Sequence, residues 1–190
     1  MGKLVIITAP SGSGKTTVAR HLLAHFPQLY FSISATTRAP RAHEQHGRDY
    51  FFVTEEQFRR MIEQQEFLEW EEVYPGTWYG SLQSELFKGW HQGKAVLYDI
   101  DVFGAQRLKE KFGSAALTLF IRPPSVATLK ERLLSRGTES AEQVERRLSK
   151  AVRELQLESV FDHVVVNEDL AQTLNHATDL VHQFLSNNSC

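Results

Sequence analysis

Residues 9–17, APSGSGKTT, combine residue types that bind phosphate. Gly12 and Gly14 allow the backbone to turn its N–H groups toward an anion, because glycine tolerates backbone angles that other residues resist. Lys15 would place a positive charge on the outer phosphates of a nucleotide, and the hydroxyl of Thr16 would hold Mg²⁺. The pattern G-x-x-x-x-G-K-[ST] is complete except at its first position, where Ala9 is expected to be tolerated if its φ is negative.

The chain around this segment has the order that a phosphate-binding loop requires. An apolar run over residues 4–7 predicts a short buried strand, and a helix is expected to begin near Lys15. The start of that helix adds unsatisfied N–H groups and the positive end of the helix dipole. The alternative, a Gly/Ser turn with a surface lysine, does not account for this order. We therefore predict a nucleotide-binding site.

A second group of residues could bind another phosphate. Arg38 and Arg41 lie three apart, beside Pro40, and Tyr50 follows. Planar guanidinium groups bind phosphate through two parallel hydrogen bonds, and a phenol adds a neutral donor. The alternative is a solvated basic loop, which composition alone favours. The loop upstream weighs against it, since a phosphotransferase needs a second phosphate site.

Acidic residues could recognise a base and a metal ion. Glu69 and Asp101, with Ser34, could accept the N1–H and 2-amino hydrogens of guanine, a donor pair that adenine does not offer. Taken alone, Glu69 would instead be a solvated acid. Asp99 ends an apolar strand, where an aspartate holds Mg²⁺ or its waters in many nucleotide-binding proteins. Its alternative role is to cap the next helix, and Asp99 and Asp101 could divide the two roles.

A third group consists of Arg132, Arg136 and Arg147. The first two lie one turn apart on one predicted helix, and Arg147 lies on the next, beyond the segment RGTES. Arginines that a lid brings inward would stabilise the charge of a phosphoryl group in transfer and exclude water. The alternative is that they are exposed and paired with Glu131 or Glu145.

His43 and His46 flank an acidic loop and have the residue type of metal ligands. No cysteine or third histidine lies near them in the sequence, so a solvated loop is the favoured interpretation.

Apolar strands alternate with helices along most of the chain, which predicts an α/β fold with a parallel sheet covered by helices on both faces. Residues 35–83 interrupt this alternation and predict an insertion with a small sheet of its own. Strands are expected at 4–7, 29–34, 50–53, 95–101, 115–121 and 164–166. Helices are expected at 15–26, 84–92, 102–112, 123–136, 140–158 and 170–185, and a further helix is expected to open at Thr54.

Composition narrows the range of partners. A formal net charge of −2 gives no electrostatic reason to expect binding to nucleic acid or to an anionic membrane. Hydrophobic residues make up 42% of the chain, but no run approaches the length of a membrane span. The single cysteine, Cys190, fits a reducing compartment, so we expect a cytoplasmic protein. The residues leave open whether it is a monomer or a homodimer.

The motifs taken together resemble the guanylate kinase family over nearly the whole chain. The segments that carry the resemblance are APSGSGKT, SISATTRAPR, GRDYFFV, FLEWEEVYPGTWYGS, LYDIDVFGA, RLLSRGTES, RRLSKA and VVVNEDL. The resemblance implies a P-loop core (residues 1–34, 84–125 and 157–190), a mixed α/β GMP-binding insertion (35–83) and a helical lid (126–156). It also implies small-molecule substrates, ATP and GMP, with Mg²⁺ as cofactor.

The resemblance assigns roles to residues that match the family motifs. Catalysis would involve Lys15, Arg38, Asp99, Arg136 and Arg147, and Mg²⁺ would be served by Thr16 and Asp99. ATP would be bound by Ala9, Pro10, Ser11, Gly12, Ser13, Gly14, Lys15, Thr16, Thr17, Arg132 and Asn167. GMP would be bound by Ser34, Arg38, Arg41, Tyr50, Glu69, Tyr79, Ser81, Asp99 and Asp101.

The expected function is ATP-dependent phosphorylation of GMP to GDP. Two other classes stay open. One is an interaction module that binds phosphorylated partners through Arg38 and Arg41 without chemistry, against which the intact Lys15 and Thr16 argue. The other is a kinase for a phosphosugar such as ribose 1,5-bisphosphate, which would need no guanine-binding set.

Overall fold

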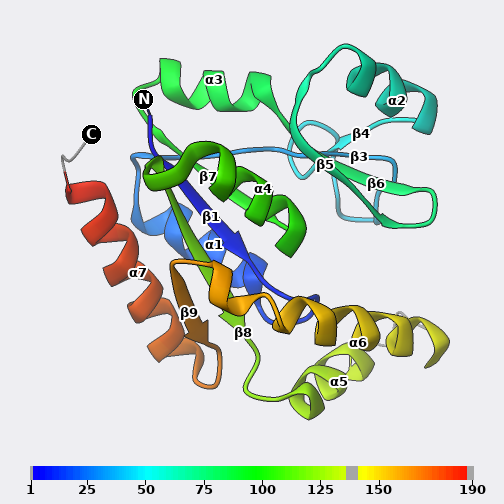
Figure 1. Ribbon diagram of the computed structural model, residues 1–190, viewed down its shortest axis with the longest axis vertical. Coiled ribbons are helices and arrows are strands. Elements are labelled where there is room, and N and C mark those ends of the chain that lie inside the picture. Colours follow the sequence, from blue (N-terminus) through cyan, green and yellow to red (C-terminus); the bar gives the residue numbers. More distant parts are fainter. Residues whose placement is uncertain (1, 136–140, 188–190) are drawn as a thin grey trace.

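The main sheet is built from short apolar strands that pair in parallel (Figure 1). The computed structural model describes residues 2–135 and 141–187, and in this part of the chain the sheet has the order β2-β7-β1-β8-β9. Its strands are β1 (Leu4–Thr8), β2 (Leu29–Phe31), β7 (Ala95–Ile100), β8 (Ala116–Arg122) and β9 (His163–Val166). Because all of them run in one direction, their carboxyl ends meet at one edge.

Helices cover both faces of this sheet, as its continuously apolar strands predict. Val5 and Ile7 pack on one side with α1 (Lys15–His25) and α7 (Leu170–Ser186). Leu4 and Ile6 point the other way, toward α3 (Gln83–His91) and α4 (Val102–Phe112). The central strand β1 is therefore buried on both faces, which fixes the point where the following loop begins.

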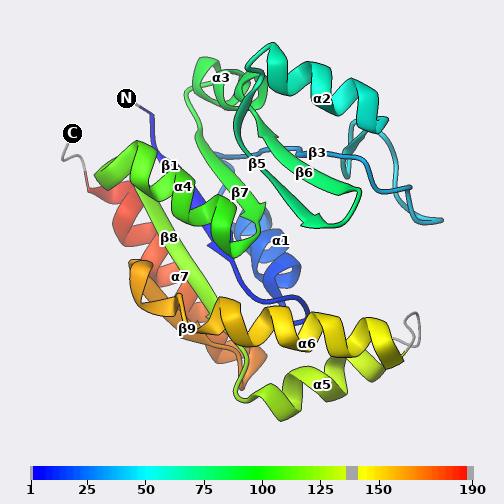
Figure 2. The same ribbon diagram turned by 45° about the vertical axis from the view of Figure 1, so that its right-hand side comes forward.

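A second sheet lies beside the first and has a small core of its own (Figure 2). Its order is β4-β3-β6-β5, and α2 (Glu55–Glu63) packs on it through Phe58. Thr54 and Gln57 form a capping box at the start of α2. The strands are β3 (Ala35–Thr36), β4 (Phe51–Phe52), β5 (Phe67–Tyr74) and β6 (Thr77–Leu82).

The helices α5 (Val126–Ser135) and α6 (Ala141–Leu155) pack together on a separate apolar cluster that includes Leu129 and Leu148. Both views show this pair and the second sheet on either side of the point where β1 ends (Figures 1 and 2). Two short 3₁₀ segments complete the described elements, Gly113–Ala115 and Glu158–Val160. None of the helices in the described ranges is long and apolar enough to cross a membrane.

One predicted strand is shorter than expected. The alternation over residues 29–34 predicts a strand of that length, but β2 ends at Phe31. Ser32 N still donates to Leu97 O of β7 at 2.9 Å, and the next amide, Ile33 N, turns to the buried carboxylate of Glu85 at 3.3 Å. The chain then leaves the main sheet and enters the second one at Ala35.

Candidate active site

The loop between β1 and α1 has the geometry of an anion cradle. Gly12 and Gly14 have φ of 94° and 96°, a region that side chains disfavour. Gly14 caps α1 without a side-chain hydrogen bond, so the first N–H groups of the helix face the loop. Among the described residues other than glycine, a positive φ occurs only at Gln65. Ala9 therefore does not have a positive φ, which is the condition under which alanine is tolerated at the first position of the loop pattern.

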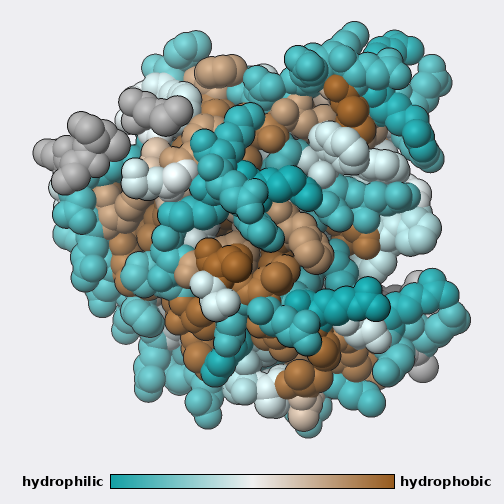
Figure 3. Space-filling model, in the orientation of Figure 1, coloured by the Kyte–Doolittle hydropathy of each residue, from teal (hydrophilic) through white to brown (hydrophobic). Residues whose placement is uncertain are grey.

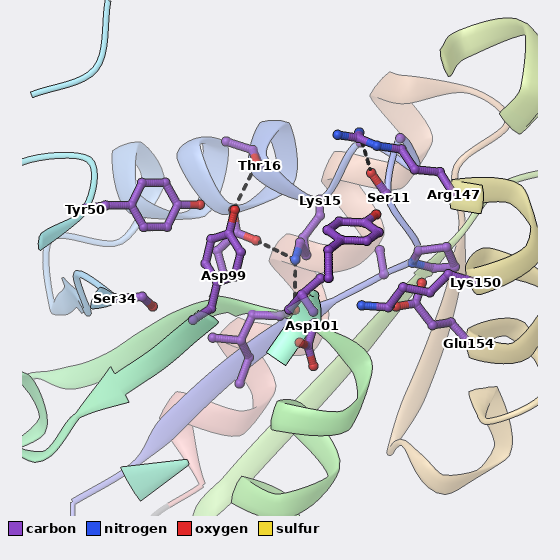
Figure 4. A pocket seen from close by; sticks show the side chains of 18 of the residues that line it. Ser11, Lys15, Thr16, Ser34, Tyr50, Asp99, Asp101, Arg147, Lys150 and Glu154 are labelled. Carbon is purple, nitrogen blue, oxygen red and sulfur yellow. Dashed lines mark hydrogen bonds and ion pairs between the residues drawn. The ribbon is translucent and has the colours of Figure 1, made fainter. Parts of the chain in front are cut away.

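The strand β7 adds an acidic side chain beside the loop, because it pairs with β1 so that Asp99 lies opposite Ile7. Asp99 Oδ2 accepts a hydrogen bond from Thr16 Oγ1 at 2.9 Å, and Lys15 Nζ lies 3.2 Å from Asp99 Oδ1 (Figure 4). Burial disfavours the charged form of Lys15, but Asp99, Tyr50 and Asp101 together more than offset this, and the pKa of Lys15 is raised. Lys15 is therefore a cation in the neutral pH range.

Asn167 and Arg132 stabilise the loop through hydrogen bonds outside the cavity. Asn167 Nδ2 donates to Ser13 O at 2.8 Å, and Arg132 Nη2 donates to Asn167 O at 3.2 Å. A Cβ at Gly14 would lie 2.4 Å from Asn167 Nδ2, so this packing requires glycine there. Arg132, Asn167 and Ser13 do not line the cavity described below.

Asp101 and Glu69 face each other at the start of α4. Asp101 caps α4 by accepting from Gly104 N at 2.8 Å, so the capping role falls to Asp101 and Asp99 stays at the loop. Glu69, only 8% exposed, accepts from Ser81 Oγ at 2.5 Å. The interpretation of Glu69 as a solvated acid is wrong. Burial raises the pKa of Glu69 to about 7, and the charge of Asp101 adds to this.

Two residues of α4 shape the surroundings of Glu69. A Cβ at Gly104 would lie 2.5 Å from Glu69 Oε2, so the carboxylate packs directly on the helix backbone. Arg107 Nη2 bonds to Glu71 Oε2 at 2.7 Å and lies 3.7 Å from Glu69 Oε2. It is the cation that opposes protonation of Glu69.

In the arginine-rich segment, Arg41 lines the cavity described below but Arg38 does not. Arg41, Tyr50 and Tyr79 line it, and so does Ser34. Arg38 is absent from the lining, because its guanidinium bonds to Tyr79 Oη at 3.1 Å and to both carboxylate oxygens of Glu44.

The helix α6 supplies three side chains that point toward the loop (Figure 4). Arg147 Nη1 donates to Ser11 Oγ at 3.2 Å, and Lys150 and Glu154 also line the cavity. Lys150 Nζ lies 3.5 Å from Glu154 Oε1 and 5.5 Å from the ring centre of Tyr74 in β5. Burial raises the pKa of Glu154 to about 7. Arg136 lies outside the described residues.

One cavity of about 290 Å³ collects these groups. It opens between the β5–β6 hairpin and α6, where the surface is hollowed (Figure 3). The predicted residues that line it are Ala9, Pro10, Ser11, Gly12, Gly14, Lys15, Thr16, Thr17, Ser34, Arg41, Tyr50, Glu69, Tyr79, Asp99, Asp101 and Arg147. Ser81 and Arg38 reach it only through Glu69 and Tyr79.

Sequence reasoning missed several residues here. Lys150 and Glu154 follow Arg147 by three and seven positions, so helical spacing could have placed them on the same face. No helical or strand spacing could have identified Glu44, since an irregular turn brings it to its partner Arg38. His43 and His46 are exposed, and within the described ranges no three His, Cys, Asp or Glu side chains gather as a metal site.

The resemblance to known proteins extends over nearly the whole chain. A family model described as guanylate kinase matches residues 1–184. The chain belongs to the guanylate kinase family. The guanylate kinase of Porphyromonas gingivalis is 46% identical over 98% of this chain and 100% of its own length. That of Bacteroides fragilis is 45% identical over 96% of this chain and 90% of its own length.

A solved structure supports the same family. The crystal structure of guanylate kinase from Anaplasma phagocytophilum matches with a TM-score of 0.79 at 30% identity, over 98% of this chain and 88% of that one. Members of the guanylate kinase family are nucleotide kinases, which act on nucleotide substrates and use a divalent cation.

Proposed function

We propose that this protein transfers the terminal phosphoryl group of ATP to GMP, giving ADP and GDP. The observation that supports this most directly is that one cavity is lined both by Lys15 of the phosphate loop and by Glu69 and Arg41 of the second sheet. A kinase for a nucleoside monophosphate needs these two binding regions on either side of a shared space.

ATP would bind with its phosphates on the loop of residues 9–14 and the start of α1. Lys15 would contact the outer phosphates, and Arg132 and Asn167 would lie toward the adenosine end. Thr16 Oγ1 and Asp99 Oδ2 lie 2.9 Å apart. Both are oxygen ligands of the kind that Mg²⁺ prefers, and we expect Thr16 and Asp99 to hold it. When bound, that ion would neutralise phosphate charge.

GMP would bind on the other side of the cavity. Its phosphate would contact Arg41, Tyr50 and Tyr79, with Arg38 close by. Guanine would donate its N1–H and 2-amino hydrogens to Glu69, assisted by Ser34, Ser81, Asp99 and Asp101. A buried carboxylate left without those donors is destabilised, so the site would reject adenine and uracil strongly.

The transfer needs no general base, because the phosphate oxygen of GMP is already a nucleophile. That oxygen forms a bond to the terminal phosphorus of ATP while the bond to the bridging oxygen breaks, and ADP leaves with the electron pair. Lys15, Arg136 and Arg147 would stabilise the charge on the transferring group. The protein would thus act through positioning and charge.

We divide the chain into a core of residues 1–34, 84–125 and 157–190, a GMP-binding insertion of residues 35–83 and a lid of residues 126–156. The separate apolar clusters around Phe58 and around Leu129 support this division. We place the reaction in the cytoplasm, which the single cysteine fits.

Two other functions are less well supported. An interaction module that binds phosphorylated partners would not need Lys15 held by Asp99 or a charged face on α6. A phosphosugar kinase would not need the buried pair of Glu69 and Ser81.

A coupled assay that compares GMP, dGMP, AMP, UMP and ribose 1,5-bisphosphate as acceptors tests the proposal. We expect GMP to be used at least a hundredfold more efficiently than AMP or UMP. Preference for ribose 1,5-bisphosphate, or no transfer to any acceptor, would refute it.

Substitution of the loop lysine tests the assigned chemistry. Lys15→Ala should lower turnover by a factor on the order of a thousand, since its charge acts on the transferring group. The melting temperature should change little, which separates loss of chemistry from loss of the fold. Turnover within tenfold of the original protein would contradict the role of Lys15.

A further inference from the structure

The guanidinium of Arg38 is held almost entirely by groups of its own chain. Nη1 and Nη2 bond to the two carboxylate oxygens of Glu44 at 2.9 and 3.0 Å, the parallel arrangement that arginine also uses for phosphate. Nη1 also donates to Ala39 O at 2.7 Å, and Nε donates to Tyr79 Oη at 3.1 Å. Of the five N–H groups of a guanidinium, these bonds use one on Nε, two on Nη1 and one on Nη2.

Glu44 is tied to the second arginine of the segment as well. Its Oε2 accepts from Arg41 N at 2.8 Å, and its Oε1 lies 3.8 Å from Arg41 Nη1. The side chain of Glu44 is only 7% exposed, whereas that of Arg41 is 58% exposed. Hydrogen bonding from Arg38 holds the pKa of Glu44 below its ordinary value, so the carboxylate is ionised throughout the neutral range.

This arrangement determines what each arginine presents to the cavity. Arg41, Tyr50 and Tyr79 line it, while Arg38 lies behind Tyr79 with one N–H of Nη2 still available. Arg38 also stacks over Tyr50, with Cζ 5.3 Å from the ring centre. Arg38 is thus in contact with both phenols, and Glu44 fixes the orientation of its planar group.

We propose that Glu44 is a positioning residue for the acceptor phosphate. It anchors Arg38 against Tyr79 and fixes the backbone at Arg41, so that the donors of this segment converge on one anion before the substrate arrives. Preorganised donors bind more tightly because less freedom is lost on binding. This inference rests on the proposed function, since it assigns the cavity wall at Arg41 to the phosphate of GMP.

The test is the variant Glu44→Gln, which keeps the shape of the side chain and removes its charge. We expect the KM for GMP to rise about ten- to thirtyfold, the range for loss of charge-assisted hydrogen bonds. The kcat at saturating GMP and the KM for ATP should stay within twofold. Glu55→Gln is the matched control, because Glu55 pairs with Arg59 at 2.7 Å on the exposed side of α2 in the same segment.

Two further measurements separate positioning from a general structural role. Guanosine, which has the base but no phosphate, should bind equally to the original protein and to Glu44→Gln. In an Arg38→Met background, Glu44→Gln should weaken GMP binding by less than threefold, because the group that Glu44 orients is gone. The variant Glu44→Asp, which keeps the charge, should recover part of the GMP affinity.

An unchanged KM for GMP in Glu44→Gln would overturn the inference. A lower KM would also overturn it, since that result would mean that Glu44 competes with the phosphate. Equal losses in guanosine binding, ATP affinity and melting temperature would reduce Glu44 to a structural residue. If the original protein does not phosphorylate GMP at all, the proposed function fails instead.

Discussion

Glu69 is a buried carboxylate whose ionisation depends on few neighbours. Burial is the main cause that raises its pKa and Asp101 adds to it, while the hydrogen bond from Ser81 and the charge of Arg107 lower it. The result is a pKa of about 7, against an ordinary 4.5. Since a guanine base donates two hydrogen bonds, we expect it to bind the ionised form of Glu69 better than the protonated form.

The affinity for GMP should therefore fall in acid. Below pH 7 we expect the KM for GMP to rise toward tenfold per pH unit, because Glu69 is then protonated. Arg107→Met should move this inflection to higher pH by removing the opposing cation. The phosphate of GMP itself titrates near pH 6, so the part of the profile that persists in Glu69→Gln belongs to the substrate. An inflection near the ordinary carboxyl pKa would contradict this.

Folding stability should favour the protonated form of Glu69, whereas GMP binding should favour the ionised form. Because the folded pKa of Glu69 is raised, its contribution to stability is present below the unfolded pKa of 4.5 and is lost as the pH rises through about 7. At pH 8 Glu69→Gln should therefore melt at a higher temperature than the original protein. Thermal unfolding at pH 8 and at pH 4.5 measures this, and a lower melting temperature at pH 8 would show that the charge is compensated.

Among the elements, the turn between β1 and α1 depends on glycine for two separate reasons. Gly14 has φ of 96° and lies against Asn167, whereas Gly76 in the β5–β6 hairpin has φ of 73° with open space around it. Both Gly14→Ala and Gly76→Ala should destabilise by about 1–2 kcal/mol through the backbone. We expect only Gly14→Ala to lose ATP affinity, by tenfold or more, as measured by titration calorimetry. Equal ATP binding in the two variants would disprove the packing argument.

At the start of α4, Gly104 lies directly against the carboxylate of Glu69. Alanine is favoured over glycine within a helix by about 1 kcal/mol, yet a Cβ at Gly104 would contact Glu69. Gly104→Ala should therefore raise the KM for GMP at least tenfold and leave the KM for ATP unchanged. Gly89→Ala in α3 is the control, because its Cβ would meet Val96 in the core instead. It should lower stability without changing either KM.

At the scale of the whole molecule, two walls approach each other across the cavity. Lys150 of α6 lies over Tyr74 of β5, and Arg147 reaches Ser11 of the phosphate loop. We expect ATP and GMP to draw these walls together, because the two nucleotides would bind on opposite sides of the cavity and arginines from both sides must approach the transferring phosphoryl group. Small-angle X-ray scattering should show a smaller radius of gyration with a non-hydrolysable ATP analogue and GMP. The same nucleotides should compact Lys15→Ala less, and no compaction of the original protein would count against closure.

Local residue patterns were sufficient for much of the fold and part of the site. The order of strand, glycine loop and helix in residues 4–25 identifies a phosphate-binding loop, because each feature is set by neighbours in the chain. The apolar strands likewise predict a parallel sheet with helices on both faces, which the structure has. The sequence also allowed Asp99 and Asp101 to take different roles, and the structure has Asp101 as the cap of α4.

Only the tertiary structure decided the relations between distant segments. The pairing of β1 with β7 brings Asp99 to Thr16, and packing of α4 on β5 buries Glu69. The bond between Arg38 and Glu44 follows from a turn with no periodic pattern. By itself, the sequence determined which residue types are available and in which elements they lie. Their protonation, their partners and their access to the cavity depend on burial and on contacts across the chain, which no local pattern encodes.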